Sequence, residues 1–408
     1  MHTIGASLLG GGSAAFGVTA GELPQPAPTR EALQEQALEQ YASLLDSFGD
    51  SLEMNYPDYY AGAYLNSESK LVIKTANPSA TAKRSLQAAA QNEALLFEEA
   101  EYSYDELIEI KDAIFNYMEG HPDKGRLPIE LCSLDEENNR VVVYLQELTD
   151  ENIARVKNVV DSPAISFTAI PKSESDETAS LDKPSFQAEQ LDFRTLIPKA
   201  ARVTPTLLYS GNHIYTDKLA GASTQKVDMS VGYRAKYQHG GTTEIGFLTA
   251  GHGTKDNGGV YSSSLTKIGT VTRRIFDSRG DFAFVKMTNT TTVYSSIAGQ
   301  SGSVSSTYGT ALQGMTVYKC GYAGGIAYGV VESSSAEAFG TAGVKDLLQI
   351  KLTTGSVLAG DSGGIVYCRS SSGVNIPVGI ISGQRQLKYK YLMSMKAGNI
   401  AQFGIYPR

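Results

Sequence analysis

The sequence predicts an all-β domain built from two antiparallel barrels, preceded by a smaller α+β domain. The composition indicates a turn-rich β protein, because the 408 residues include 41 glycines and 23 tyrosines but no tryptophan. From about residue 203 onward, short strands alternate with turns rich in Gly, Ser, Thr and Asn, as is typical of antiparallel barrels. The first half instead mixes helical and strand periodicities, and the length suffices for two or three domains.

The first 20 residues are weakly apolar and end in the small residues Val18-Thr19-Ala20. This pattern favours a signal peptide cleaved after Ala20. Five glycines dilute the stretch and no Lys or Arg precedes it, so a disordered or truncated N-terminus is the alternative. No run approaches 18 consecutive apolar residues, and the sequence therefore predicts no transmembrane helix.

Residues 29–170 have the pattern of an α+β domain. Helices are predicted where apolar residues recur every three to four positions, as at Leu107, Ile110 and Ile114, and strands where short apolar runs are bounded by turn residues. The predicted elements, in order, are a helix over 29–48, strands over 61–65 and 71–74 joined by a tip at 66–69, a helix over 104–118, strands over 128–132 and 140–145, a helix over 149–160 and a strand over 164–170.

A polar stretch rich in Ser, Asp, Glu, Lys and Pro covers residues 171–191, so we place a linker at 171–200. The two barrels then occupy residues 201–408. A stretch rich in Gly, Ser and Thr at 299–311 separates one barrel from the other, and a helical pattern near 391–403 predicts a terminal helix.

Charge is divided unevenly between the two halves of the chain. Residues 1–200 hold 15 basic and 33 acidic side chains, a net charge of −18, whereas residues 201–408 hold 20 and 10, a net charge of +10. Fields of opposite sign predict that the halves attract each other, although the same charges would also keep each domain soluble by itself. The basic residues are scattered and form no run, which disfavours nucleic-acid binding.

The most informative segment of the chain is Gly360-Asp361-Ser362-Gly363-Gly364. The flanking glycines let the backbone turn sharply, so that the N–H groups of Gly360 and Ser362 can point into one concavity and form an oxyanion hole. A serine held in this way attacks a carbonyl group when a base takes its proton. Taken alone, the segment is also compatible with an ordinary glycine-rich turn.

Two upstream segments supply the partners that a nucleophilic serine needs. Among the five histidines only His252 follows a buried-strand pattern and sits among small residues, in Phe247-Leu248-Thr249-Ala250-Gly251-His252-Gly253. Asp281 opens an apolar strand, where a half-buried carboxylate needs a partner such as an imidazole N–H. We therefore predict a catalytic triad in which His252 is the base, Asp281 orients it and Ser362 is the nucleophile.

These three segments together resemble the chymotrypsin-like serine peptidases, and most of all the bacterial secreted branch typified by α-lytic protease and the streptogrisins. The resemblance covers roughly residues 205–408. It implies that His252 and Asp281 lie on the first barrel and Ser362 on the second, with the substrate in the cleft between them.

The resemblance also implies a role for the first half of the chain, because the streptogrisin-like peptidases are made with an N-terminal pro-region that assists folding and blocks the site. Residues 29–170 are expected to dock against the cleft, with an apolar contact near Ala164–Ile170. A permanently attached binding domain is the alternative.

Further roles around the triad follow from the same resemblance. Ser382 would support Asp281 and, together with Gly383 and Gln384, begin the wall of the substrate pocket. Ser356 stands where trypsin-like enzymes carry an acid, so we expect an apolar or small side chain before the scissile bond. Charge recognition of Lys or Arg is not expected at this pocket.

Asp361 is not expected to be catalytic. In relatives the corresponding carboxylate is buried and holds the oxyanion loop in shape, often through an arginine near the start of the second barrel. The matching position here is Tyr322, which leaves the partner of Asp361 open.

The chain has three cysteines. A bridge in the relatives joins a cysteine just after the catalytic serine to one at the start of the second barrel, which implies a disulfide between Cys320 and Cys368 and leaves Cys132 unpaired. Such a bridge indicates an oxidising compartment. Two buried free thiols are the alternative.

The sequence thus predicts a secreted, extracellular bacterial serine endopeptidase that cleaves polypeptides through an acyl-enzyme. It would be made as a proenzyme and inhibited by its own N-terminal domain, with no metal, cofactor, nucleic-acid or membrane partner. An inactive peptidase-fold binding protein is the alternative. An esterase of the α/β-hydrolase type is disfavoured, because those enzymes place the serine before the histidine along the chain.

Overall fold

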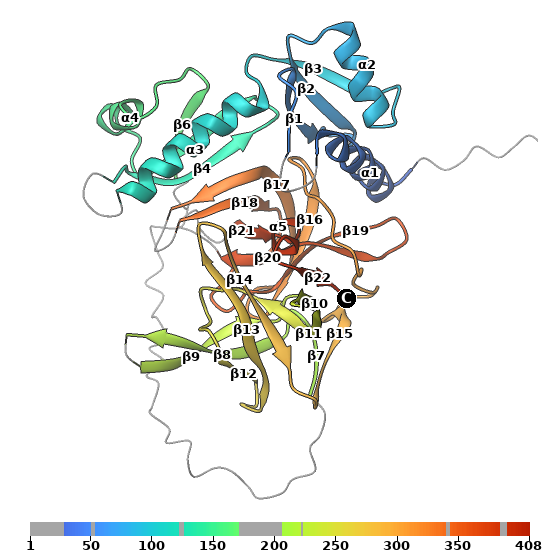
Figure 1. Ribbon diagram of the computed structural model, residues 1–408, viewed down its shortest axis with the longest axis vertical. Helices are drawn as coiled ribbons and strands as arrows, with labels where there is room; N and C mark the ends of the chain where they lie inside the picture. The colour runs from blue at the N-terminus through green and yellow to red at the C-terminus, as the bar shows by residue number, and fades with distance from the viewer. Residues whose placement is uncertain are drawn as a thin grey trace, which may run out of the picture.

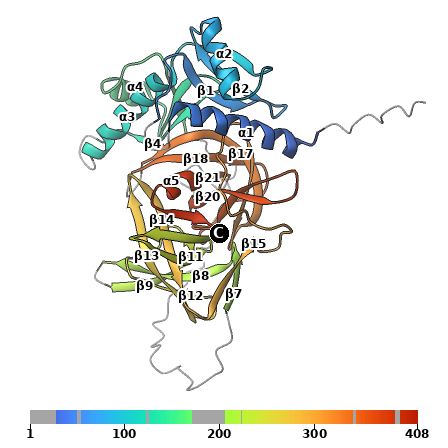
Figure 2. The same ribbon diagram turned by 45° about the vertical axis from the view of Figure 1, so that its right-hand side comes forward.

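The computed structural model describes residues 28–49, 54–121, 126–170, 206–221, 223–339, 343–383 and 390–408. The expected signal peptide at 1–20 and the linker at 171–200 lie outside the described residues. Among the helices described, none is both long and apolar enough to cross a membrane. The helical N-terminal part lies at one end of the molecule, and the C-terminal strands form the rest (Figures 1 and 2).

The N-terminal part contains every helix and strand predicted between 29 and 170, with bounds shifted by a few residues. Thr29 caps the first helix by accepting a hydrogen bond from the N–H of Ala32, and Ser103 and Glu106 form a capping box at the helix that begins with Tyr104. The elements are α1 (Arg30–Phe48), β1 (Tyr60–Leu65), β2 (Leu71–Ala76), α2 (Ala80–Ala89), β3 (Leu96–Ala100), α3 (Tyr104–Gly120), β4 (Ile129–Asp135), β5 (Arg140–Leu145), α4 (Asp150–Lys157) and β6 (Ile165–Ala169).

The sequence does not predict two of these elements, α2 and β3. Helix α2 is short and buries only Ala82 and Leu86, so it contains few large apolar residues that would mark it in the sequence. Strand β3 carries Glu98 and Glu99, buries none of its residues and lies at the edge of a sheet ordered β1-β2-β3. Both elements form against other parts of the fold, as β3 does by pairing with β2, so the pattern of residues within each segment does not predict them.

The C-terminal strands form two antiparallel bodies, as the sequence predicts. The first sheet is ordered β22-β10-β11-β14-β13-β12-β8-β9, and β7 pairs with β15. The second closes into a barrel, because β16, β19, β20, β21, β18 and β17 are neighbours in that order and β17 pairs again with β16. The stretch 299–311 lies between the two bodies. The elements are β7 (Thr206–Ser210), β8 (His213–Ala220), β9 (Ser223–Ser230), β10 (Arg234–His239), β11 (Thr242–Thr249), β12 (Gly259–Ser262), β13 (Lys267–Asp277), β14 (Gly280–Met287), β15 (Thr291–Ile297), β16 (Thr316–Gly321), β17 (Gly325–Ala338), β18 (Val344–Leu352), β19 (Ile365–Arg369), β20 (Asn375–Gly383), β21 (Tyr391–Lys396), α5 (Ala397–Ala401) and β22 (Ile405–Pro407).

The predicted terminal helix over 391–403 is wrong. Its first part is strand β21, and only the short helix α5 follows before β22. Strand β21 lies between β18 and β20 and buries side chains on both of its faces. A strand buried on both faces is a continuous apolar run, which periodicity alone does not distinguish from a buried helix.

A strand pairing joins the N-terminal part to the second barrel. Strand β4 runs antiparallel to β17, with Ser133 opposite Ala336 and Cys132 opposite Glu337, so that β4, β5 and β6 extend the barrel sheet. Strand β6 lies at the far edge of this sheet, and Ile170 just after it packs against the buried cluster that Leu131 shares with the barrels, so the predicted contact near Ala164–Ile170 is present only at its last residue. β4 pairs there because the edge of β17 offers unpaired backbone groups.

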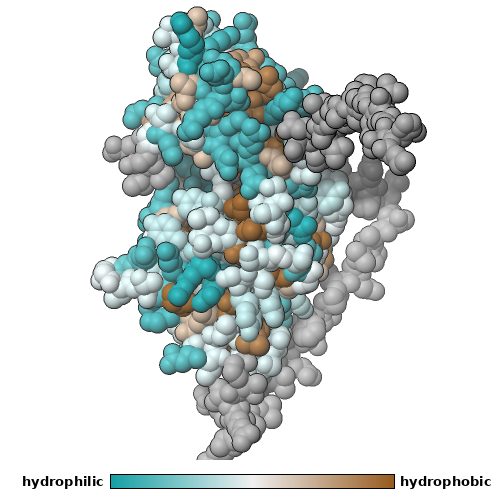
Figure 3. Space-filling view, turned by 90° about the vertical axis from the view of Figure 1, so that its right-hand side faces the viewer, coloured by the Kyte–Doolittle hydropathy of each residue, from teal (hydrophilic) through white to brown (hydrophobic). Residues whose placement is uncertain are grey.

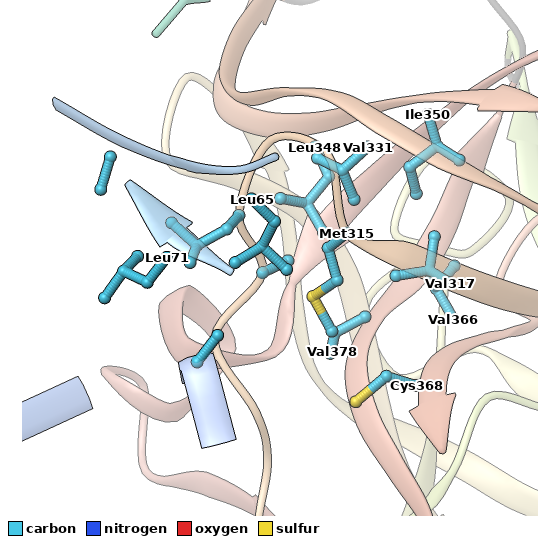
Figure 4. Close-up of a cluster of buried hydrophobic side chains, with 14 of the residues drawn as sticks. Leu65, Leu71, Met315, Val317, Val331, Leu348, Ile350, Val366, Cys368 and Val378 are labelled. Carbon is cyan, nitrogen blue, oxygen red and sulfur yellow. The ribbon is translucent and has the colours of Figure 1, made fainter. Parts of the chain in front are cut away.

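Apolar packing joins the same two parts. Leu65 and Leu71 of the β1–β2 hairpin lie beside Met315 and Leu348 of the second barrel, in one cluster of buried side chains (Figure 4). Burying an aliphatic side chain of this size stabilises a fold by about 1.5–3 kcal/mol. The seam between the parts therefore combines a strand pairing with an apolar contact.

The surface differs in character between the parts. The side of the molecule in Figure 3 is most hydrophilic over the N-terminal part, at the top, and paler over the barrels. This difference agrees with the 33 acidic residues of the first half and with the many Ser, Thr, Gly and Tyr residues of the second. Charge on the barrels is therefore local and easy to attribute to particular side chains.

The predicted disulfide between Cys320 and Cys368 is wrong, because both residues and Cys132 are buried free thiols. The register of β16 and β19 places Cys320 opposite Ile365, three residues before Cys368. Neighbouring residues of a strand point to opposite faces, so the two thiols enter different cores. Burial raises the pKa of Cys320 to about 11 and that of Cys368 to about 12.

Candidate active site

The segment Gly360–Gly364 forms the loop between β18 and β19. Gly360 and Gly363 have φ angles of +100° and +88°, which glycine adopts without the steric cost of a Cβ atom. Ser230 fixes the loop: its hydroxyl donates to the Gly360 carbonyl at 2.7 Å, and its N–H donates to the Ser362 carbonyl at 2.8 Å. No described residue accepts a hydrogen bond from the N–H of Gly360 or Ser362.

The partner of Asp361 is Lys319, which the sequence analysis missed. Lys319 Nζ lies 2.7 Å from Asp361 Oδ2, and both side chains are fully buried. The other carboxylate oxygen accepts hydrogen bonds from the N–H groups of Ala323 and Gly324 at 2.9 and 2.7 Å. Through these contacts Asp361 connects the loop that contains Gly360–Gly364 to the turn between β16 and β17. The available signal was a single lysine inside an apolar strand, since a buried charge needs a counter-charge.

The register of two strands brings the candidate base and its carboxylate together. Thr249 at the end of β11 lies opposite Ala283 of β14, so His252, three residues past the end of β11, becomes a neighbour of Asp281, which lies two residues before Ala283 in β14. The glycines beside the histidine are required by close packing. A Cβ atom on Gly251 would lie 2.1 Å from the Ile275 carbonyl oxygen, and one on Gly253 would lie 2.3 Å from Met229 Sδ.

Asp281 orients the imidazole of His252. His252 Nδ1 lies 2.8 Å from Asp281 Oδ2, and the His252 N–H donates to Oδ1 at 2.8 Å. The Ser382 hydroxyl donates to Oδ2 at 2.5 Å. Burial by itself would raise the pKa of Asp281, but the charge of His252 and the hydrogen bonds from His252 and Ser382 lower this pKa below its ordinary value. An ionised Asp281 holds the proton of the ring on Nδ1 and leaves Nε2 as the basic nitrogen.

His252, Asp281 and Ser362 line one cleft of about 1090 Å³. His252 and Ser362 are each partly exposed to it, and no hydrogen bond joins their side chains in the described part of the structure. Catalytic hydrogen bonds are often long before substrate binds. The three candidate residues therefore share one cleft, with His252 and Asp281 in direct contact.

The candidate pocket residues divide into three groups. Ser382 and Gly383 line the cleft. Ser356 is not among the residues that line the cleft, and its carbonyl oxygen lies beside Gly324, in the turn between β16 and β17. Gln384 lies outside the described residues.

Other residues that line the cleft have no sequence signal, because they come from separate elements. The second barrel contributes the apolar side chains of Phe339, Leu358, Ala359 and Met393. The N-terminal part contributes Arg126, Ile129, Glu130 and Gln146. Among the described residues, no group of three His, Cys, Asp or Glu side chains is placed to hold a metal ion.

Two family models match the N-terminal half of the chain. A model described as a Pro-like N-terminal domain matches residues 27–110, and one described as a Pro-like C-terminal domain matches residues 105–169. Together they cover the chain from α1 to β6. No curated protein sequence matches the chain.

About half of the chain is similar to solved bacterial proteases. Thermobifida fusca protease A is 24% identical over 49% of this chain and 98% of its own, with a TM-score of 0.38. The Nocardiopsis protease NAPase is 20% identical over 50% of this chain and 100% of its own, with a TM-score of 0.40. Cellulomonas bogoriensis chymotrypsin is 20% identical over 50% and 98%, with a TM-score of 0.37. The chain thus resembles bacterial chymotrypsin-like proteases, as the sequence predicts.

Proposed function

We propose that this chain is the precursor of a secreted bacterial serine endopeptidase. The observation that carries the proposal is the chain of hydrogen bonds from Ser382 through Asp281 to His252, which ends at an imidazole facing the same cleft as Ser362. A carboxylate bound to Nδ1 leaves Nε2 to act as a base toward a serine hydroxyl. The free N–H groups of Gly360 and Ser362 favour the negative charge that develops on a carbonyl oxygen.

The reaction would follow two steps that use the same groups. Ser362 Oγ attacks the carbonyl carbon of the scissile bond while His252 Nε2 takes its proton, and the N–H groups of Gly360 and Ser362 bind the oxyanion. His252 then protonates the leaving amine, and the C–N bond breaks to give an acyl-enzyme. Water attacks the ester with His252 as base, which releases the acid and returns the proton to Ser362. Asp281 stays ionised and stabilises the imidazolium in both steps.

The N-terminal part would act as an inhibitory pro-region. Ile129, Glu130 and Gln146 line the same cleft as the candidate triad, so a polypeptide substrate meets them when it enters. The Pro-like family models support this role. We propose a signal peptide at 1–20, a pro-region at 29–170, a linker at 171–200 where processing separates the halves, and a peptidase domain at 201–408.

The test replaces the nucleophile in the secreted protein. Ser362→Ala removes one hydroxyl, so the fold should persist while peptide hydrolysis falls by at least about 10⁴-fold. A fluorophosphonate should label the wild type at Ser362 and leave the variant unlabelled, as shown by mass spectrometry of the labelled peptide. Ser263→Ala, at an exposed serine, is the matched control and should keep full activity. Hydrolysis that survives in Ser362→Ala, or a label on another residue, would refute the assignment.

A further inference from the structure

Three cations gather around the candidate base. Lys218 on β8, Lys255 just after His252, and Arg274 on β13 all line the cleft that holds the imidazole. Arg274 Nε donates to the Gly251 carbonyl at 2.9 Å, so its guanidinium is tied to the loop that carries the base. In the proposed reaction His252 passes a proton to the leaving amine. In this reaction the leaving amine therefore lies beside the imidazole, in the cleft that these cations line.

Neutral contacts position these cations without cancelling their charge. Lys255 Nζ donates to Thr224 Oγ1 at 2.6 Å, and the Arg274 guanidinium lies 5.6 Å from the centroid of the Phe276 ring. Lys218 pairs with Gln225 of β9 through the strand ladder, and its side chain forms no hydrogen bond or ion pair with another described residue. None of the three cations lies within ion-pair distance of a carboxylate in the described part of the chain.

The nearest carboxylates are already engaged or exposed. Asp217, the neighbour of Lys218, is paired with Lys226 at 2.9 Å, and Asp277 on β13 is paired with Arg279 at 2.6 Å. Asp256 lines the cleft but is exposed to solvent. The first-barrel residues that line the cleft therefore comprise three cations against Asp256 and the His252-bound Asp281, whereas Glu130 comes from the N-terminal part; we call this first-barrel side the cationic end of the cleft.

We propose that the cationic end of the cleft selects substrates with an acidic side chain within the first residues after the scissile bond. The proposal rests on the proposed peptidase function and names a feature of its substrates. A partly exposed ion pair contributes up to about fivefold in affinity, so two or three cations acting on one carboxylate predict roughly a tenfold preference. The preference should shrink as salt rises, because the screening length falls from about 10 Å at 0.1 M to about 3 Å at 1 M.

The experiment compares matched peptides that differ only after the scissile bond. The secreted enzyme, with active sites counted by fluorophosphonate titration, is given quenched fluorescent peptides that are randomised before the cleaved bond. The second residue after that bond is Glu, Gln or Lys. We expect kcat/KM for the Glu series to exceed that for the Gln series about tenfold, with the Lys series lowest. Lys218→Gln and Lys255→Gln should each reduce the Glu-to-Gln ratio severalfold, and Lys218→Glu should raise the Lys series.

Lys267→Gln is the matched control, because Lys267 is exposed on β13 and does not line the cleft. It should leave the ratio unchanged. Equal rates for the Glu and Gln series in a titratable enzyme, or a ratio indifferent to Lys218 and Lys255, would overturn the acidic preference while leaving the peptidase function standing. An absence of both labelling and hydrolysis would overturn the two proposals together.

Discussion

The seam between the N-terminal part and the second barrel contains two buried carboxyl groups that should make it sensitive to pH. Glu136, in the turn between β4 and β5, accepts a hydrogen bond from the Ser334 hydroxyl of β17. Glu337 of β17 is fully buried and lies 2.9 Å from Lys111 Nζ of α3. In each carboxyl group the second oxygen is buried and has no hydrogen-bond partner in the described part of the chain.

Burial raises the pKa of Glu136 from its ordinary value of 4.5 to about 7. Burial also raises the pKa of Glu337, although the charge of Lys111 opposes this effect. If separation of the two parts exposes these groups, their pKa values return to the ordinary range. The joined state then binds more protons than the separated state, so its stability is fully present below about pH 4.5 and is lost as pH rises through about 7. For Glu136 alone, the difference corresponds to about 300-fold in affinity, or about 3 kcal/mol.

The assay uses a chain cut once in the linker, so that the two parts are held only by their contacts. The dissociation constant between them is measured from pH 5 to pH 8 for the wild type and for Glu136→Gln. The wild-type affinity should fall as pH rises, by up to tenfold per pH unit below pH 7. Glu136→Gln keeps the shape of the protonated acid without its titration, so it should bind more tightly than the wild type at pH 8 and show a flatter pH dependence.

Glu151→Gln, at an exposed position of α4, is the matched control and should follow the wild-type curve. Two results would refute the reasoning: a wild-type affinity that is constant or rises with pH, or a Glu136→Gln variant with the wild-type slope. Titration of the active site does not enter this measurement, because binding and not hydrolysis is recorded.

Two further predictions concern the candidate site. Lys319→Met leaves the Asp361 carboxylate buried without its counter-charge, so the free energy of unfolding measured in urea should fall by about 3–5 kcal/mol. Lys351→Met, at an exposed lysine, is the control and should change this free energy by less than about 0.5 kcal/mol. Similar losses in both variants would contradict the role of the Lys319–Asp361 pair. Ser382→Ala removes a donor to an ionised carboxylate, so kcat/KM should fall about tenfold or more, and an unchanged kcat/KM would show that the 2.5 Å hydrogen bond does not matter for the reaction.

The part of the site that could be predicted from the sequence is the part carried by short segments. The glycines around Ser362 and the small residues around His252 mark sharp turns at strand ends, and such turns can be read from a few neighbouring residues. The two barrels could be predicted for the same reason, since short strands and polar turns alternate along the chain. The structure places the three candidate residues in one cleft.

The features that the sequence missed depend on residues far apart in the chain. The pairing of Lys319 with Asp361 spans 42 residues and follows from the folding of β16 beside the serine loop. The disulfide prediction was wrong because the register of β16 and β19 decides which face the thiols of Cys320 and Cys368 point to, and the number of residues between two cysteines does not. The cations of the cleft come from β8, from the loop after His252 and from β13, so no local pattern joins them.

The chemistry of the seam bears on whether the N-terminal part is removed or stays attached. Replacing a buried ion pair by apolar residues is often neutral or stabilising, so a permanent contact gains little from the Lys111–Glu337 pair. The seam also contains the buried acid Glu136 and a second pair, Lys345 with Asp112, at 3.0 Å. The carboxyl groups of Glu136 and Glu337 and the Lys111 ammonium are desolvated when the parts are joined and regain water when they separate, which lowers the free energy needed to part them relative to an all-apolar seam. Such a seam favours a part that leaves after folding over a permanently attached domain.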